Sequence, residues 1–139
     1  MRKTIESAKL LRIVDANLNR AKEGLRVCED ICRYGFDLQK ETRQLKDMRH
    51  ALTAAIETLG IKSLLMARDI GGDIGRASTV SEFKRRDLDD VFYANAQRVK
   101  ESVRVLEEVL KLIDGKQAQV LKEWRYKFYA VEPKMLGKR

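Results

Sequence analysis

One phrase occurs twice in this chain, and it limits what the chain can fold into. The segment "ANLNRAKEGLRVCE" occupies residues 16–29, and "ANAQRVKESVRVLE" occupies residues 94–107, which is 78 positions later. Aligned over residues 13–33 and 91–111, the two stretches share eight identities in 21 positions. Two copies of one sequence are expected to form two copies of one structural element, which then pack together.

The spacing of apolar residues around the first copy predicts an amphipathic helix that ends near Tyr34. Gly35 interrupts this pattern, and no segment of the chain alternates apolar and polar residues as a half-buried strand does. The apolar residues recur every three or four positions, at Leu10, Leu11, Val14, Leu18, Ala21, Leu25, Cys28 and Cys32.

Capping residues and chain breakers predict the ends of the remaining helices. We expect a short helix and an irregular stretch between the two halves of the chain, and Pro133 is expected to stop the last helix. The predicted helices run from a Thr4 cap to Tyr34, from an Asp37 cap to Leu59, from Ile61 to Arg68, from Ser81 or Asp87 to Asp114, and from Lys116 to Val131.

The likeness of the two copies continues into the helix that follows each of them, because "LKDMRH" at residues 45–50 matches "LKEWRY" at residues 121–126. The repeated unit is therefore a helical hairpin, and two hairpins predict an all-α bundle of four long helices with a glycine-rich connecting loop. An approximate internal two-fold axis would bring matched residues together. We expect a single domain over residues 1–139, with repeat 1 at about 12–60, the loop at 61–86 and repeat 2 at about 87–132.

Composition narrows the class of protein. The chain has 139 residues, 44% of them hydrophobic, and its formal net charge is +8. It lacks a long apolar run and a secretory leader, so we expect a cytoplasmic protein without a membrane partner. Most basic residues are interleaved with acids, which favours a polyanionic metabolite over nucleic acid as the ligand. Cys28 and Cys32 lie four positions apart on one helix face, which suits two buried thiols better than a disulfide.

The repeated phrase carries polar residues in unusual positions. On a helical wheel, Asn17 lies in the middle of the apolar arc, Arg20 lies inside it and Glu23 lies at its border, whereas Glu29 falls on the polar side. The second copy repeats the pattern with Asn95, Arg98 and Glu101. Two interpretations are open. These residues either cross-link the helices and fix their register, or they line a pocket for a polar ligand, which Arg49 and His50 on the second helix could join.

The irregular stretch contains "RDIGGDIG", which begins at Arg68. Its glycines permit a close approach to a phosphate, and Asp69 and Asp73 could hold Mg²⁺. The stretch is neither a Walker loop nor a dinucleotide-binding fingerprint. A solvated turn between the two hairpins is the alternative interpretation.

Three segments, "RIVDANLNRAKEGLRVCEDICRYGF", "LKDMRHAL" and "RDIGGDIG", resemble the helical domain at the N-terminus of some bacterial thiamine-phosphate synthases, which also occurs as a stand-alone protein. The resemblance runs from about Arg12 to Glu108. It implies a hydroxymethylpyrimidine-phosphate kinase, which would convert 4-amino-5-hydroxymethyl-2-methylpyrimidine phosphate to the diphosphate with ATP and Mg²⁺. The chain is too short to include a (β/α)₈ synthase barrel as well.

The motif residues of this family fall on matching positions of the chain. Family members often have Thr-Pro where Ile70 and Gly71 stand here, which puts a hydroxyl contact at that point in doubt. The matching positions are Asp15, Asn17, Arg20, Glu23, Arg26, Arg49, His50, Arg68, Asp69, Gly72, Asp73, Gly75, Asn95, Arg98, Glu101 and Arg104.

We assign expected roles to these residues from their chemistry. Glu23, His50 and Asp69 are the candidate catalytic residues, and Asp69 and Asp73 are the candidate Mg²⁺ ligands. Arginines can clamp phosphates, and carboxamides can pair with a pyrimidine. The candidate binding residues are Asn17, Arg20, Arg49, Arg68, Gly72, Gly75, Asn95, Arg98 and Glu101.

Two other functions remain open at this point. One is a non-catalytic docking or dimerisation module for a thiamine-phosphate synthase, with Trp124, Phe128 and Tyr129 on an outer helix face. The other is a small nucleotide- or RNA-binding bundle with its basic residues on one face. The kinase hypothesis instead predicts a closed pocket lined by both copies of the phrase. We separately expect a homodimer, because a bundle with its own two-fold axis often buries one more face.

Overall fold

The structure is a computed structural model that describes residues 5–78 and 84–137. These residues form helices and contain no strand, which confirms the all-α prediction. The elements in chain order are α1 (Ile5–Asp30), a π-helical turn η1 (Ile31–Gly35), α2 (Gln39–Glu57), α3 (Ile61–Ala67), α4 (Leu88–Leu110) and α5 (Gly115–Gly137).

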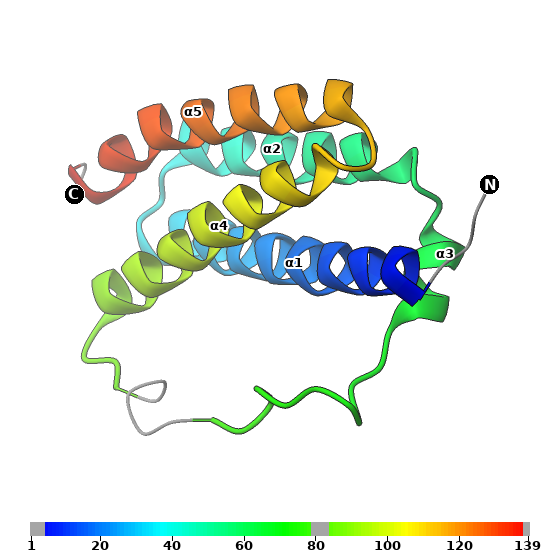
Figure 1. Ribbon diagram of the computed structural model, residues 1–139. Helices are drawn as coiled ribbons and strands as arrows, with labels where there is room; N and C mark the ends of the chain where they lie inside the picture. Colours follow the sequence, from blue (N-terminus) through cyan, green and yellow to red (C-terminus); the bar gives the residue numbers. More distant parts are fainter. Residues whose placement is uncertain (1–4, 79–83, 138–139) are drawn as a thin grey trace.

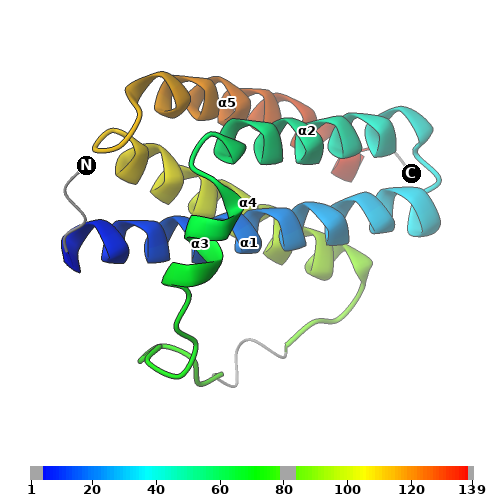
Figure 2. The ribbon, with the colours of Figure 1, turned by 90° about the vertical axis from the view of Figure 1, so that its right-hand side faces the viewer.

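The four long helices form two layers (Figure 1). The first layer is α1 with α4, which crosses it obliquely, and the second is α2 with α5. Each of α2 and α5 runs back along the helix that precedes it, and the short helix α3 lies beside α1 (Figure 2). Residues 68–78, which follow α3, lie below α1 in Figure 1, on the side away from α2 and α5.

The core lies between the two layers and contains apolar side chains from every helix. In α1 the buried apolar residues are Val14, Leu18, Ala21, Leu25 and Cys28, all at predicted positions. Facing helices contribute the largest fully buried side chains, which include Phe92, Leu106, Leu121, Phe128, Leu52 and Ile56. The helical spacing of the sequence thus identifies the core-facing side of α1 correctly.

One predicted helix end differs from the structure at Asp37. The N-cap of α2 is Leu38, which offers no side-chain oxygen, and Thr42 instead donates a hydrogen bond to the Leu38 carbonyl at 2.7 Å. Asp37 has a φ of 54° and turns the chain between η1 and α2, a conformation that aspartate tolerates better than most residues. At α4 the cap is Asp87, as expected; the alternative, Ser81, and the predicted Thr4 cap lie outside the described residues.

Pro133 does not stop the last helix, because α5 continues to Gly137. A proline inside a helix costs about 3 kcal/mol through its missing N–H and its ring clash. Met135 lies two residues further on and is fully buried, and burial of a side chain of this kind contributes about 1.5–3 kcal/mol. Packing of the final turn on the core therefore offsets much of the penalty that the sequence rule anticipates.

A buried ion pair joins the two helices of each half. In the first half, Arg49 Nε donates to Glu29 Oε1 at 3.2 Å, and in the second half Arg125 pairs with Glu107 through two nitrogens. Both glutamates are 3% exposed, so the prediction that Glu29 faces solvent is wrong. A helical wheel considers one helix alone, and it places Glu29 just beyond the apolar arc. In the structure Glu29 is buried because Arg49, on α2, pairs with it.

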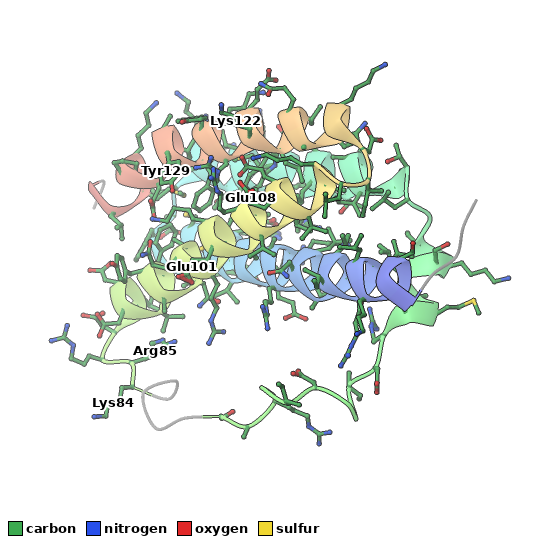
Figure 3. The ribbon with its side chains drawn as sticks, in the orientation of Figure 1. Lys84, Arg85, Glu101, Glu108, Lys122 and Tyr129 are labelled. Carbon is green, nitrogen blue, oxygen red and sulfur yellow. The ribbon has the colours of Figure 1, made fainter. Side chains whose placement is uncertain are left out.

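We predict that Glu107→Ala lowers the free energy of unfolding by about 3–5 kcal/mol, because it leaves the Arg125 guanidinium buried without a partner. Glu108→Ala is the matched control, since Glu108 is the next residue, lies exposed on α4 (Figure 3) and pairs only at the surface with Arg104 and Lys111. Urea unfolding of both variants measures the difference. Equal stability of the two variants would show that the buried pair contributes nothing.

The two cysteines are buried as expected. Both are free thiols with no exposed surface, and the Cys28 Sγ–H faces the Phe92 carbonyl at 3.8 Å. Burial raises the pKa of Cys28 above its usual range and raises the pKa of Cys32 to about 12. The thiolate, which is the reactive form, is therefore disfavoured in the folded protein.

We predict that neither Cys28 nor Cys32 reacts with a thiol reagent at pH 8 until the protein unfolds. Because folding raises both pKa values, the associated stability is present below the unfolded-state pKa of about 8.5 and declines as the pH rises above it. Labelling rates in buffer and in denaturant, measured from pH 7 to 10, check this. Rapid labelling of the folded protein at pH 8 would contradict the burial of these thiols.

Candidate functional site

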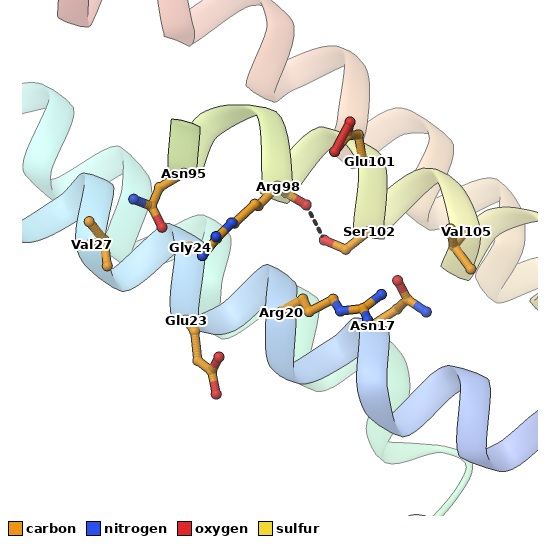
Figure 4. Close-up of a pocket in the computed structure, with 10 residues that line it drawn as sticks. All are labelled: Asn17, Arg20, Glu23, Gly24, Val27, Asn95, Arg98, Glu101, Ser102 and Val105. Carbon is orange, nitrogen blue, oxygen red and sulfur yellow. Dashed lines mark hydrogen bonds between the residues drawn. The ribbon is translucent and has the colours of Figure 1, made fainter. Parts of the chain in front are cut away.

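A polar groove of about 550 Å³ lies between α1 and α4. Each lining residue has its repeat partner, 78 positions away, in the same groove. In Figure 4 Asn17 and Asn95 lie toward opposite ends of the groove, and Glu23 and Glu101 lie at opposite edges. The five matched pairs are Asn17 with Asn95, Arg20 with Arg98, Glu23 with Glu101, Gly24 with Ser102, and Val27 with Val105.

Close contact of the two helices at Gly24 sets the floor of this groove. A Cβ atom added to Gly24 would lie 2.9 Å from Val99 Cγ2 and 3.0 Å from the Asn95 carbonyl oxygen, too close for any other residue without a shift. At the matched position, the Ser102 hydroxyl donates to the Arg98 carbonyl at 2.6 Å. Small residues at both positions let the backbones approach, and the longer side chains around them form the walls.

The two asparagines make the same contact in both copies. Asn17 Nδ2 donates to the Ile13 carbonyl at 2.9 Å, and Asn95 Nδ2 donates to the Val91 carbonyl at 2.8 Å. Both bonds are within one helix, so these amides do not cross-link α1 and α4 in the described structure. The bonds anchor each side chain at the groove and leave its carboxamide oxygen available to a ligand.

Arg20 and Arg98 extend between the helices from opposite sides (Figure 4). Both are exposed, so the expectation that they lie buried inside the apolar arc is wrong. A long side chain can start at a helix interface and still carry its charge to solvent. Among the described residues neither guanidinium makes a hydrogen bond or ion pair, and Glu23 and Glu101 are likewise unpaired. Two unpaired guanidinium groups are therefore available to an anion, and two unpaired carboxylates lie in the same groove.

A second cavity of about 770 Å³ lies between α1 and the loop that follows α3, and it shares Asn17, Arg20 and Glu23 with the groove. A two-pronged ion pair fixes its wall, because Arg68 Nε and Nη2 donate to the two carboxylate oxygens of Asp15, each at 2.8 Å. This contact raises the pKa of Arg68. Arg68 therefore anchors the loop to α1, and its charge is already neutralised.

In the glycine loop (residues 68–75), two aspartate side chains accept hydrogen bonds from backbone amides of the same loop. Asp69 Oδ1 accepts from the Gly72 amide at 2.9 Å, and Asp73 Oδ1 accepts from the Gly75 amide at 3.0 Å. A Cβ atom at Gly72 would meet the Asp69 carboxylate, so another residue at this position would displace that side chain from its bond to the Gly72 amide. Among the described residues no three His, Cys, Asp or Glu side chains cluster as metal ligands. Asp69 and Asp73 each retain one carboxylate oxygen for a cation.

Several predicted site residues lie elsewhere. Arg49 is held by Glu29, and exposed His50 lines neither cavity, so the structure does not bring these two residues to the groove. Trp124 and Phe128 are buried in the core rather than presented on an outer face. Tyr129 is 43% exposed and lies near Arg125 and Lys100.

The wheel analysis gave no role to Asp15 or to the buried pair of Glu107 and Arg125. A signal for the pair was present, because Glu29 and Glu107 are identities of the repeat and Arg49 and Arg125 match in the hexapeptides "LKDMRH" and "LKEWRY". The partner of Asp15 is 53 residues away along the chain, and no repeat marks it, since Tyr93 stands at the matched position.

The fold and the groove define a small all-α protein that presents a polar groove between two helices carrying the same sequence phrase. The chain belongs to the ThiD2 family, which matches residues 12–134. Relatives include the thiamine-phosphate synthases of Synechocystis sp. (39% identical over 94% of this chain), of Rhodopirellula baltica (39% over 95%) and of Thermosynechococcus vestitus (40% over 91%).

These alignments cover 37%, 36% and 35% of the respective relatives, so the chain spans a little over a third of their length. The family and these relatives associate the chain with thiamine biosynthesis. No solved structure matches the chain. Within the described residues, no helix is both long and apolar enough to cross a membrane.

We predict that Asp15→Asn releases the start of the loop from α1, because a neutral amide cannot hold the Arg68 guanidinium as a charged, two-pronged acceptor does. Amide hydrogen exchange of residues 69–75 should become several-fold faster. Asp30→Asn is the control, since Asp30 forms only a half-exposed pair with Arg26 on its own helix. Unchanged exchange in Asp15→Asn would show that the ion pair does not fix the loop.

Proposed function

We propose that the chain is a hydroxymethylpyrimidine-phosphate kinase, which transfers the γ-phosphoryl group of ATP to the phosphate group of 4-amino-5-hydroxymethyl-2-methylpyrimidine phosphate. One observation carries the proposal. The groove between α1 and α4 holds two unpaired guanidiniums, two anchored carboxamides and two carboxylates within about 550 Å³. This set suits a small phosphorylated heterocycle, and the family and its relatives support a role in thiamine biosynthesis.

In this proposal the arginines of the groove bind phosphate and the asparagines bind the pyrimidine ring. Arg20 and Arg98 supply charge-assisted hydrogen bonds for the substrate phosphate and for the phosphoryl group in transfer. Asn17 and Asn95 each present a carboxamide oxygen that can accept from the 4-amino group, and they are held in place by their own helices. Phosphoryl transfer depends mainly on positioning and charge neutralisation, and these arginines and asparagines are residue types that can provide both.

Glu23 is the proposed general base, since it is unpaired among the described residues and lines both cavities. An oxygen of the substrate phosphate forms a bond to the γ-phosphorus, and the bond from that phosphorus to the β–γ bridging oxygen breaks. When the substrate phosphate carries a proton, that proton passes to the Glu23 carboxylate, and ADP leaves. His50, which the sequence offered as an alternative base, lies outside both cavities and has no part in this proposal.

The residues present fit an Mg²⁺ ion that arrives with ATP. Mg²⁺ is commonly held by one or two carboxylates, with phosphate oxygens and water completing its shell. Asp69 and Asp73 line the second cavity, and one oxygen of each is free of the loop bonds described above. When bound, the ion would neutralise charge on the phosphates, and these two carboxylates would hold it.

We also propose that the two halves are copies of one helical hairpin related by an approximate two-fold axis. The contacts repeat as well as the sequence, since Arg26 pairs with Glu29 and Arg104 pairs with Glu107. Matched residues meet at the opposite side of the bundle, where Trp124 Nε1 donates to the Met48 carbonyl at 2.8 Å. The groove then lies where the axis passes between α1 and α4.

A partnership follows from the relatives, which are more than twice as long as this chain and are named thiamine-phosphate synthases. We propose that this protein acts beside such a synthase, which would consume the diphosphate product, and that it works as a homodimer. Size-exclusion chromatography with light scattering tests the dimer, and a monomeric mass at working concentration would refute it.

The test of the activity is a coupled assay of ADP formation with the pyrimidine monophosphate, ATP and Mg²⁺. We predict turnover by the wild type and a fall in kcat/KM of about 10²-fold in Arg98→Ala, because one preorganised donor to the phosphates is lost. Asn95→Ala should raise the KM for the pyrimidine. Arg43→Ala on α2 is the control, since it removes an equally exposed arginine that lines none of the cavities described.

Circular dichroism and the unfolding midpoint verify that each variant is folded. A folded wild type that forms no ADP would overturn the kinase proposal and favour the non-catalytic docking module. Loss of activity in Arg43→Ala equal to that in Arg98→Ala would remove the groove from the mechanism.

A further inference from the structure

We infer that the second cavity, between α1 and the loop that follows α3, is the binding site for a nucleoside triphosphate. This inference rests on the proposed kinase function, which requires two ligands but does not say where the nucleotide lies. The cavity measures about 770 Å³ and is larger than the groove between α1 and α4. The larger of the two ligands thus has the larger cavity.

The charges of this cavity favour a polyphosphate. Lys9 and Arg20 make no ion pair among the described residues, and Arg12 donates to the neutral carbonyl of Asp69 at 2.9 Å. These three cations therefore keep their full charge. Of the acids in the cavity, Asp15 is neutralised by Arg68 through two hydrogen bonds. A polyphosphate with its Mg²⁺ would balance the remaining cations and the free carboxylate oxygens together.

The same cavity has an apolar side. Ile13, Ala16 and Ile70 line it, and the two isoleucines are exposed to solvent in the absence of a ligand. An exposed apolar wall next to a cationic one matches a nucleotide, whose planar base is apolar on its faces and whose phosphates are charged. A free phosphate would use only the cationic side.

A third cavity of about 370 Å³, on α4 and α5, serves as a comparison. It is also lined by cations, but they are not available to a polyphosphate. Each of its cations is already paired. Lys100 binds Glu132 at 3.0 Å, Arg104 binds Glu108 at 3.1 Å, and Arg125 binds Glu107. This cavity borders the groove through Glu101, on the edge opposite the second cavity, so the two flanks of the groove differ in available charge.

The shared wall then explains how two ligands would meet. Asn17, Arg20 and Glu23 line both the groove and the second cavity. Their repeat partners all line the groove, none of them lines the second cavity, and Glu101 also lines the third cavity. Arg20 is thus placed between a nucleotide and the pyrimidine phosphate, where it can hold the phosphoryl group in transfer. Arg98, its repeat partner, lines the groove but not the second cavity, so it would not contact ATP that binds without the pyrimidine.

The test is isothermal titration of ATP with Mg²⁺ into the protein without any pyrimidine. We expect binding by the wild type, and a loss of affinity of roughly tenfold in Lys9→Ala, Arg12→Ala and Arg20→Ala, since each removes one charged donor. Arg98→Ala and the control Arg43→Ala should bind ATP as the wild type does. Lys9 makes no hydrogen bond or ion pair among the described residues, so its variant is not expected to disturb the loop as Arg12→Ala would.

The pyrimidine monophosphate titrated alone should give the complementary pattern, with affinity lost in Arg98→Ala and kept in Lys9→Ala. Absence of ATP binding to the folded wild type, or a loss in Arg98→Ala as large as in Lys9→Ala, would overturn the assignment of this cavity. ATP binding with the expected pattern but no ADP formation would instead overturn the kinase proposal and leave the nucleotide site standing.

Discussion

The contact of α1 with α4 at Gly24 determines the geometry of the site. The backbones approach so closely there that a methyl group would meet Val99 and the Asn95 carbonyl. With the helices held at this separation, side chains two turns away are too far apart to close the gap, and a polar groove opens beside the contact. Gly24 and Ser102 are small for this reason, and the residues that surround them provide the chemistry.

The buried glutamate–arginine pairs hold the second layer in register with this contact. Each pair joins the phrase-bearing helix of one half to the helix that follows it, so that α2 and α5 cover the side of α1 and α4 opposite the groove. A buried ion pair adds little stability compared with a well-packed apolar pair, but it penalises any other register strongly. Two identical pairs in matched places thus favour one arrangement of four otherwise similar amphipathic helices.

Much of this was accessible from the sequence, and the exceptions share one cause. Periodicity identified the helices and the core face of α1, because those depend on neighbours within one helix. It placed Glu29 in solvent and Arg20 in the core, because the location of a charged side chain depends on a partner or an opening supplied by another helix. Comparison of the two copies recovers part of that information. It brings Asn17 and Asn95 to one groove without any knowledge of the structure, and Glu29 with Arg49 could have been found in the same way.

One ion pair, between Arg68 and Asp15, has no counterpart in the second copy of the phrase, so comparison of the two copies could not predict it. Five matched pairs line the groove, so under the proposed two-fold arrangement the groove alone would offer a ligand two similar orientations. The proposed phosphoryl transfer needs an unsymmetrical arrangement, with the donor on one side and the acceptor on the other. The loop after α3 would supply it, because Arg68 ties that loop to Asp15 on α1, and the matched residue Tyr93 on α4 has no carboxylate with which to do the same. A single unmatched ion pair therefore distinguishes the two halves, and it places the acidic loop next to Arg20 and Glu23 rather than next to their partners.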